Sequence, residues 1–211
     1  MIRLFLIALL LLVGLKSTAF AQPQVEAGFK EISFNVFLDK NPVGTHSFFV
    51  KRHAENITVD SDMQLEGKFW GLLPFKYTHQ SKETWQDGCL VGLQSQTLKR
   101  GKTIKIIASS DKSGLFIVSD DQTQIVKGCV KSFAYWDYSK LVGNQLLNTE
   151  NGELVTVEIK QTNNQSDEHK SLLIHSSEAD ITLEYTANGE WLSLKSKLEV
   201  GGLLHYIRQQ K

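Results

Sequence analysis

Apolar and polar residues alternate through the stretch Ile57-Thr58-Val59-Asp60-Ser61-Asp62-Met63-Gln64-Leu65. Successive side chains of a β-strand point to opposite faces of its sheet, so a period of two predicts a strand with one inward face and one wetter face. The same alternation recurs in five further runs, at residues 32–38, 104–106, 155–159, 181–185 and 192–200. Strands are therefore the dominant element that the sequence predicts.

Dipeptides that tolerate the positive φ angles of tight turns separate the apolar runs. They are Asp87-Gly88, Ser113-Gly114, Asn151-Gly152, Asn188-Gly189 and Gly201-Gly202. Hairpins join antiparallel neighbours, so roughly a dozen strands in succession, with almost no helical periodicity, predict an all-β antiparallel meander. Because strand twist accumulates across such a sheet, we expect it to be strongly curved or to form an incomplete barrel around an apolar interior.

One aromatic segment breaks the alternation, Phe133-Ala134-Tyr135-Trp136-Asp137-Tyr138-Ser139-Lys140-Leu141. Its pattern favours one or two helical turns that end at Gly143, because glycine readily adopts the left-handed conformation that closes a helix. We expect a short helical plug near residues 133–142 at one end of the curved sheet.

The N-terminus has the three parts of a secretory signal peptide. Arg3 is followed by an apolar run at residues 4–15, and small residues stand at Ala19 and Ala21. This order predicts a signal peptide at residues 1–21 that is cleaved after Ala21, and a single β domain at residues 22–211 in the periplasm or outside the cell. The alternative is a membrane anchor, but a spanning helix needs about 20 apolar residues. We expect no transmembrane anchor after cleavage.

The charge of the chain limits its partners. The sequence has 23 basic and 23 acidic residues, and cleavage after Ala21 would remove only Arg3 and Lys16 from this balance. Binding to nucleic acid draws much of its free energy from clustered Lys and Arg side chains that neutralise phosphates. A nearly neutral chain without basic clusters therefore argues against nucleic acid as a partner.

Cys89 and Cys129 are the two cysteines of the chain. A pair of cysteines in an exported protein predicts a disulfide, since thiols persist in the oxidised form outside the cytoplasm. Two alternatives are a pair of separate buried thiols and, less favoured, a catalytic thiol. A bridge would tie the turn at Asp87-Gly88 to the base of the predicted plug.

Four patterns together resemble a known family: Glu83-Thr84-Trp85-Gln86-Asp87-Gly88-x-Leu90, then Tyr135-Trp136, then Leu146-Leu147-Asn148-Thr149-x-x-Gly152-x-Leu154, and then Tyr185-x-x-Asn188-Gly189-x-Trp191. They are similar to a family of exported bacterial β proteins of unknown function. The first pattern, with the turn Asp39-x-x-x-x-Gly44, is also similar to a broader group of uncharacterised periplasmic proteins with curved sheets. The resemblance implies the fold and the compartment and supplies no catalytic residues. The two cysteines are not part of the family pattern.

No residue pattern points to a cofactor, a metal or a catalytic centre. The six histidines His46, His53, His79, His169, His175 and His205 are scattered singly. Ligands gathered from distant strands remain an alternative, since β proteins build some zinc sites in that way. We expect no cofactor and no metal, and a non-enzymatic role is favoured over an enzyme of unknown chemistry.

Aromatic residues concentrate in the middle third of the chain and are the candidate ligand-binding residues: Trp70, Tyr77, Trp85, Tyr135, Trp136 and Tyr138. One interpretation is that they only fill the interior. The other is that they line a concave site for a lipid or another apolar small molecule. An alternative function is that of a structural or assembly partner in the cell envelope, acting through protein–protein contacts at an exposed strand edge.

Overall fold

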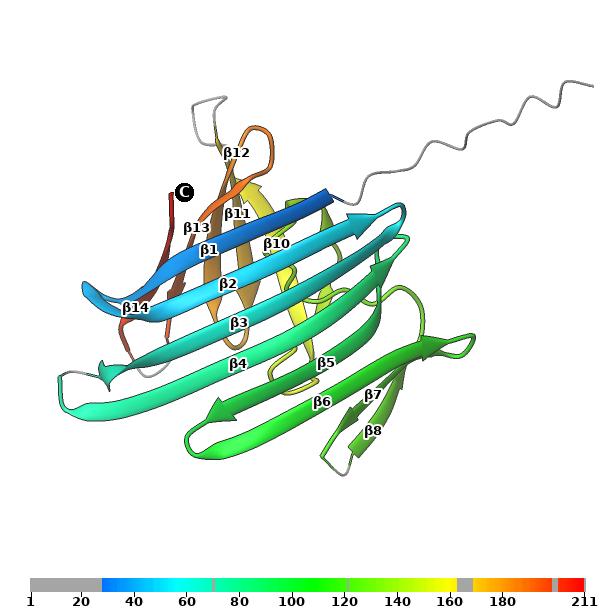
Figure 1. Cartoon of the computed structure of the whole chain (residues 1–211), viewed down its shortest axis with the longest axis horizontal. Coiled ribbons are helices and arrows are strands. Elements are labelled where there is room, and N and C mark those ends of the chain that lie inside the picture. Colours follow the sequence, from blue (N-terminus) through cyan, green and yellow to red (C-terminus); the bar gives the residue numbers. More distant parts are fainter. Residues whose placement is uncertain (1–27, 70, 121, 163–168, 199–200, 211) are drawn as a thin grey trace, which may run out of the picture.

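The computed structural model describes residues 28–210 except 70, 121, 163–168 and 199–200. The predicted signal peptide and its cleavage site lie outside the described residues. The chain is built almost entirely of β-strands (Figure 1): β1 Gly28–Leu38, β2 Asn41–His53, β3 Asn56–Phe69, β4 Leu73–Gln86, β5 Cys89–Lys99, β6 Lys102–Asp111, β7 Gly114–Ser119, β8 Gln122–Val126, β9 Gln145–Leu147, β10 Leu154–Thr162, β11 His169–Ser176, β12 Asp180–Thr186, β13 Trp191–Lys197 and β14 Leu203–Arg208.

All fourteen strands form one antiparallel sheet whose order is β8-β7-β6-β5-β4-β3-β2-β1-β14-β13-β12-β11-β10-β9. The sheet curls so that β10–β12 lie behind the long strands β1–β5 (Figure 1). The predicted all-β meander with a strongly curved sheet is confirmed. The meander has two arms, β1–β8 and β9–β14. They join at the middle of the sheet, where β1 pairs with β14, for example at Val36 and Tyr206. The consecutive strands β8 and β9 therefore stand at opposite ends of the sheet.

The alternation in the sequence becomes an inner and an outer face. In β3 the side chains of Ile57, Val59, Ser61, Met63 and Leu65 are buried, and the residues that alternate with them are half-buried or exposed. Every described strand except β8 contributes buried residues to one continuous core, which also includes Phe34, Trp85 and Trp191, and β8 packs against it through the half-buried Val126. Burial of this apolar face is the main driving force for the curvature, since each buried large side chain stabilises the fold by about 2 kcal/mol.

Every dipeptide predicted to form a turn lies in a hairpin connection. Asp87-Gly88 joins β4 to β5, with φ angles of 51° and 77°. The other four connect β6 to β7, β9 to β10, β12 to β13 and β13 to β14. The turn chemistry therefore fixes which strands are neighbours within each arm of the sheet.

The segment at residues 127–144 crosses from β8 to the far end of the sheet and supplies the predicted plug. Its helical part is a single 3₁₀ turn, η1 Tyr138–Lys140, whose N-terminus is capped by Asp137. The helix ends at Leu141, before Gly143, because the buried side chain of Leu141 packs into the core. Backbone bonds hold the start of the segment: Leu90 N donates to Val130 O at 2.9 Å, and Leu147 N donates to Lys131 O at 2.7 Å.

Cys89 and Cys129 form a disulfide, with their Cα atoms 5.1 Å apart. The bridge joins the first residue of β5 to the crossing segment, as the sequence predicted. The described part of the chain contains no helix with the length and hydrophobicity that a membrane span requires.

Replacement of both cysteines, Cys89→Ser with Cys129→Ser, should lower the stability of a protein that still folds. The bridge closes a loop with a sequence separation of 40 residues, and the chain-entropy relation assigns such a loop about 4 kcal/mol. Thermal melting followed by circular dichroism measures the change. A reducing agent should lower the melting temperature of the wild type and leave that of the double variant unchanged. Equal melting temperatures for the two proteins would show that the bridge contributes no stability.

Candidate functional site

Short polar side chains lie side by side on the inner face of the sheet. Ser61 of β3 is opposite Ser81 of β4, and Ser81 is opposite Ser95 of β5. All three are buried. A serine fills much less volume than the leucines and valines at neighbouring inward positions, so this row leaves space above the centre of the sheet. Protein interiors are close-packed, so another part of the chain must occupy that space.

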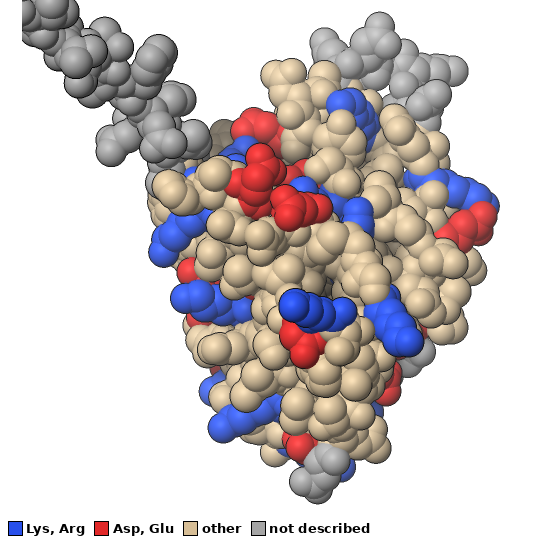
Figure 2. All heavy atoms as spheres, turned by 90° about the vertical axis from the view of Figure 1, so that its right-hand side faces the viewer, with Lys and Arg blue, Asp and Glu red and all other residues tan. Residues whose placement is uncertain are grey.

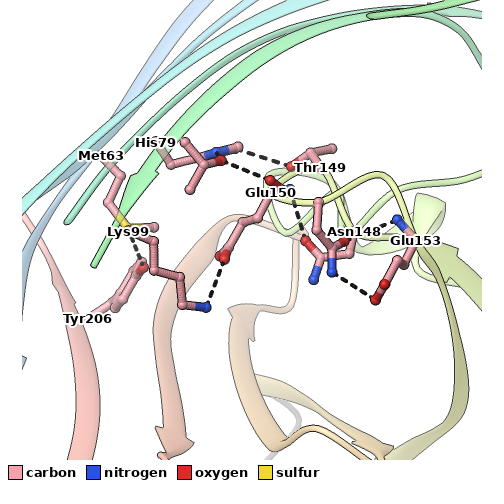
Figure 3. A network of polar contacts seen from close by, with 10 residues as sticks. Met63, His79, Lys99, Asn148, Thr149, Glu150, Glu153 and Tyr206 are labelled. Carbon is pink, nitrogen blue, oxygen red and sulfur yellow. Dashed lines mark hydrogen bonds and ion pairs between the residues drawn. The ribbon is translucent and has the colours of Figure 1, made fainter. Parts of the chain in front are cut away.

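The turn at residues 148–153, between β9 and β10, occupies it. The hydroxyl of Ser95 donates to the carbonyl oxygen of Thr149 at 2.7 Å, and that of Thr97 donates to the carbonyl oxygen of Glu150 at 3.1 Å. A turn that would ordinarily face solvent is thereby held against the inner face of β5 (Figure 3).

The end of the same turn packs on β6 to β8. Gln124 Nε2 donates to the carbonyl oxygen of Gly152 at 2.6 Å. Gly152 has a φ of +79°, and a Cβ atom there would lie 3.2 Å from Cδ1 of Ile106. Glycine is therefore required both by the backbone conformation and by the close approach to the sheet.

A group of buried and half-buried side chains, most of them polar, surrounds the inserted turn. We call it the central polar cluster: His46, Met63, Tyr77, His79, Glu150 and Tyr206. His46 Nε2 lies 2.8 Å from Ser61 Oγ, and His46 Nδ1 lies 3.3 Å from the hydroxyl of Tyr206. The same hydroxyl donates to Met63 Sδ at 3.7 Å (Figure 3). These contacts connect β2, β3 and β14 across the inner face.

His79 connects the sheet to the inserted turn. Its Nδ1 lies 2.9 Å from Thr97 Oγ1, and its Nε2 lies 3.2 Å from Thr149 Oγ1. Burial lowers the pKa of both His46 and His79, and the nearby His79 lowers that of His46 further. Both rings are therefore neutral near pH 7, and they act here as hydrogen-bonding groups without charge.

Tyr77 occupies the least satisfied position in the central polar cluster. Its buried hydroxyl has no hydrogen-bond partner among the described residues. Burial raises the pKa of Tyr77 far above its ordinary value, and the nearby carboxylate of Glu150 raises it further. Lys99 Nζ lies 3.6 Å from Glu150 Oε2 at the rim of the cluster. The hydroxyl of Tyr77 thus keeps its proton, and the carboxylate of Glu150 lies beside it as an acceptor, outside the geometry of a normal hydrogen bond.

A second buried polar group lies near the opposite end of β4. Trp85 Nε1 donates to Glu83 Oε2 at 2.7 Å, and the hydroxyl of Ser132 donates to both carboxylate oxygens of Glu83 at 3.1 Å. Burial raises the pKa of Glu83 from 4.5 to about 7, and the two donors oppose this effect. Glu83 therefore joins β4 to the crossing segment and titrates near neutral pH.

The six predicted ligand-binding aromatics fall into separate places. Trp70 lies outside the described residues. Tyr77 belongs to the central polar cluster, whereas Trp85 and Trp136 stack edge-to-face near Glu83 with ring centroids 5.8 Å apart. Tyr135 packs on Trp191 at 5.7 Å, and Tyr138 packs on Tyr185 at 5.8 Å. Tyr135 also lies close enough to Tyr77 and Glu150 for these groups to affect one another's ionisation, whereas Trp85 with Trp136 and Tyr138 with Tyr185 form separate ring contacts.

Two hollows of the described surface lie at hairpin ends. One has a volume of about 460 Å³ and lies at the β3–β4 end, lined by Glu66, Gly67, Lys68, Pro74, Phe75 and Lys76. The other is lined by Asp111, Lys112, Ser113, Gly114, Lys127 and Gly128. Neither is lined by Tyr77, Trp85, Tyr135, Trp136 or Tyr138. On the side of the molecule drawn in Figure 2, acidic and basic side chains are interspersed.

No three His, Cys, Asp or Glu side chains of residues 28–210, gaps aside, are grouped closely enough to hold a metal ion. The functional interest of the histidines lies instead in their hydrogen bonds. His46, Glu83, Glu150 and Tyr206 are not among the site residues that the sequence predicts. A signal was present in the alternation, because Ser61 falls in phase with the inward residues of β3. A polar residue in such a phase predicts a buried hydrogen bond.

Residues 34–209 match the family described as Domain of unknown function (DUF6134). The chain belongs to the DUF6134 family. The resemblance to an uncharacterised β-protein family is therefore confirmed. No protein with a curated description matches the sequence.

The fold of this DUF6134 protein is similar to a solved structure. That structure is described as the crystal structure of a beta-barrel-like protein of Domain of Unknown Function DUF1849 from Brucella abortus. The two share 12% sequence identity with a TM-score of 0.61, over 85% of this chain and 95% of that chain. The likeness supports a barrel-like fold for this member of the DUF6134 family.

Glu83→Gln should make the protein more resistant to alkaline pH. The folded-state pKa of about 7 lies above the ordinary value of 4.5, so the folded state holds this proton more tightly than the unfolded state. The wild type therefore loses stability as the pH rises through this range, by about 3 kcal/mol. The amide oxygen of glutamine can accept the hydrogen bond from Trp85 Nε1, and its amide nitrogen can donate one to Ser132 Oγ. Glutamine carries no titrating proton.

Urea unfolding across this pH range measures the effect. The free energy of unfolding of Glu83→Gln, relative to the wild type, should rise with pH. Ser132→Ala removes one donor to the carboxylate and should steepen the loss in the otherwise unchanged protein. Parallel pH profiles for the wild type and Glu83→Gln would contradict the assignment.

Proposed function

We propose that this protein is an exported, non-enzymatic component of the bacterial cell envelope that binds an apolar molecule, such as the acyl chain of a lipid, on the concave side of its sheet. The observation that carries the proposal is the buried hydroxyl of Tyr77, which makes no hydrogen bond of normal geometry within the described residues although the Glu150 carboxylate lies beside it. The arrangement of the N-terminal residues as a signal peptide supports the compartment.

An apolar track leads to this hydroxyl from the end of the β3–β4 hairpin. Leu73, Phe75 and Tyr77 occupy alternate positions of β4 and share its inner face, and Leu73 is exposed while Phe75 and Tyr77 are half-buried. On the facing strand, a Cβ atom at Gly67 would lie 2.9 Å from Val43 Cγ1 and 3.0 Å from Phe75 Cε1. The track is therefore continuous with the core and open to solvent at its outer end.

The inner end of the track has the chemistry for a polar group attached to an acyl chain. A buried hydroxyl without a partner costs about 1–3 kcal/mol. An ester or hydroxyl oxygen on a ligand would accept from Tyr77 and recover part of this cost, while the chain of the ligand would lie along Phe75. The neutral histidines nearby add no charge of their own, and the carboxylate of Glu150 is paired with Lys99.

Tyr77→Phe tests the proposal, because it removes the donor and keeps the ring. We expect the free energy of unfolding of the empty protein to stay the same or to rise by about 1 kcal/mol. We expect the affinity for a fatty acid or a lysophospholipid, titrated by tryptophan fluorescence, to fall about tenfold. Tyr138→Phe is the control, because the hydroxyl of Tyr138 already accepts from Lys170 at 3.4 Å.

Mass spectrometry of protein purified from the envelope supplies the second readout. A co-purifying lipid is the expected result. The absence of any co-purifying or titratable apolar ligand would contradict the proposal.

A second candidate function, that of an assembly partner, is favoured by the edge strand β8. Within the described residues β8 pairs only with β7, so its outer edge is available for strand addition. Ile107 of β6 is opposite Val118 of β7, and both are exposed on the outer face, as is Ile125 of β8. An apolar surface beside an open strand edge is a common site of protein–protein contact.

Ile125→Lys tests this alternative, because a lysine on an edge strand opposes the addition of another strand. Cross-linking in the intact envelope should capture a defined partner with the wild type and lose it with the variant. Ile207→Lys, at an exposed position of the central strand β14, is the matched control and should keep the partner. Identical cross-links for all three proteins would exclude the β8 edge.

A further inference from the structure

Two exposed leucines sit at the end of one hairpin, and the first of them is the most exposed large apolar side chain of the described residues. Leu72 is 81% exposed and Leu73 is 56% exposed. The turn is closed by a bond from Leu72 N to Phe69 O of 3.0 Å, and the rings of Phe69 and Phe75 pack with centroids 4.6 Å apart. We call these four residues, Phe69, Leu72, Leu73 and Phe75, the apolar tip.

The apolar tip lies at the end of a hairpin that extends past its pairing with β5. The pairing of β3 with β4 continues to Phe69 and Leu73. The pairing of β2 with β3 stops at Leu65, and that of β4 with β5 stops at Tyr77. The last four residue pairs of the hairpin therefore extend about 13 Å past the end of the pairing with β5. On the other side, Val43 of β2 still lies against Gly67.

The projecting hairpin is amphipathic. Phe69, Leu73 and Phe75 share one face, while the exposed side chains of Lys68 and Lys76 lie on the other. The single acidic residue in this part is Glu66, opposite Lys76. Neither lysine forms an ion pair within the described residues, so both positive charges are available to a partner.

Further basic side chains stand at the same end of the sheet. Because Tyr77 pairs with Lys99, the β5–β6 turn lies beside the base of the projecting hairpin (Figure 1). That turn carries Arg100 and Lys102, both exposed, and the β1–β2 turn at the same end carries Lys40. The acidic residues Asp39 and Asp120 also lie in turns at this end, and Asp39 accepts from Leu203 N at 2.9 Å.

We propose that the apolar tip inserts into the surface of an anionic phospholipid bilayer, with Lys68, Lys76 and the β5–β6 turn against the headgroups. Apolar side chains of peripheral proteins enter the boundary of headgroups and acyl chains to a depth of about 5–10 Å, which the projection of the hairpin allows. Lysines close to such a surface are attracted by anionic lipids. A protein partner would need a preformed groove to bind a narrow convex tip, whereas a bilayer needs none. A bilayer is therefore the better match for this surface. This surface is distinct from the concave site, and docking does not require a ligand there.

The test is sedimentation of the purified protein with vesicles. We expect binding to vesicles of phosphatidylethanolamine with phosphatidylglycerol, weaker binding to phosphatidylcholine alone, and a loss of binding as salt screens the lysines. Leu72→Asp with Leu73→Asp should lower the partition coefficient at least about tenfold. Both positions are exposed, so circular dichroism should show an unchanged fold.

Two further variants make the result specific. Lys68→Gln with Lys76→Gln should reduce the preference for anionic vesicles more than it reduces binding to phosphatidylcholine. Ile107→Asp removes an exposed apolar side chain far from the tip and should bind as the wild type does. The proposal is overturned if the wild type stays in the supernatant with every vesicle, or if the Leu72 and Leu73 double variant binds as well as the wild type.

Discussion

The space above Ser61, Ser81 and Ser95 is the constraint on which the rest of the interior depends. A curved sheet encloses more volume where its inward side chains are short, and a folded protein does not keep that volume empty. The turn at residues 148–153 enters it and satisfies its own carbonyl groups on Ser95 and Thr97. The crossing segment at residues 127–144 then follows a path set by the two ends it has to join, β8 and β9. The disulfide and the buried Glu83 hold the beginning of that path against β4 and β5.

The polar interior is a consequence of this arrangement. Backbone carbonyls that enter a core need donors, and hydroxyl and imidazole groups on the inner face provide them. His79 serves both sides, because one ring nitrogen meets the sheet and the other meets the turn. Neutral histidines suit this role, since a charged ring would cost several kcal/mol to bury. Tyr77 differs from these groups because its buried hydroxyl forms no hydrogen bond of normal geometry within the described residues. For that reason we propose it as a group that binds a ligand.

The sequence predicts much of the fold because its signals are local. Alternation in residues 57–65 assigns the inner face of β3, and glycine-containing dipeptides such as Asn188-Gly189 assign the hairpins. The pairing of β1 with β14 is not local, because it joins residues more than 160 positions apart, such as Val36 and Tyr206. The inward position of Asn151-Gly152 could not be predicted from the sequence either, since a turn has the same sequence whether it faces solvent or the core. The central polar cluster depends on both of these features, and aromatic content alone selected Tyr77 and missed its neighbours.

The pairing of β1 with β14 also sets the order in which the molecule can be completed. As the chain emerges from its N-terminus, β1–β8 can form successive hairpins, but the second edge of β1 stays open until residues 203–208 arrive. Contacts between such distant parts of a chain form slowly, and an open edge with alternating apolar residues invites association with other chains. The folding chain is therefore most prone to associate with other chains before the final short strand, β14, pairs with β1. Proteolytic trimming of those six residues would part the sheet at its middle and leave two separate arms, each with a freshly exposed flank.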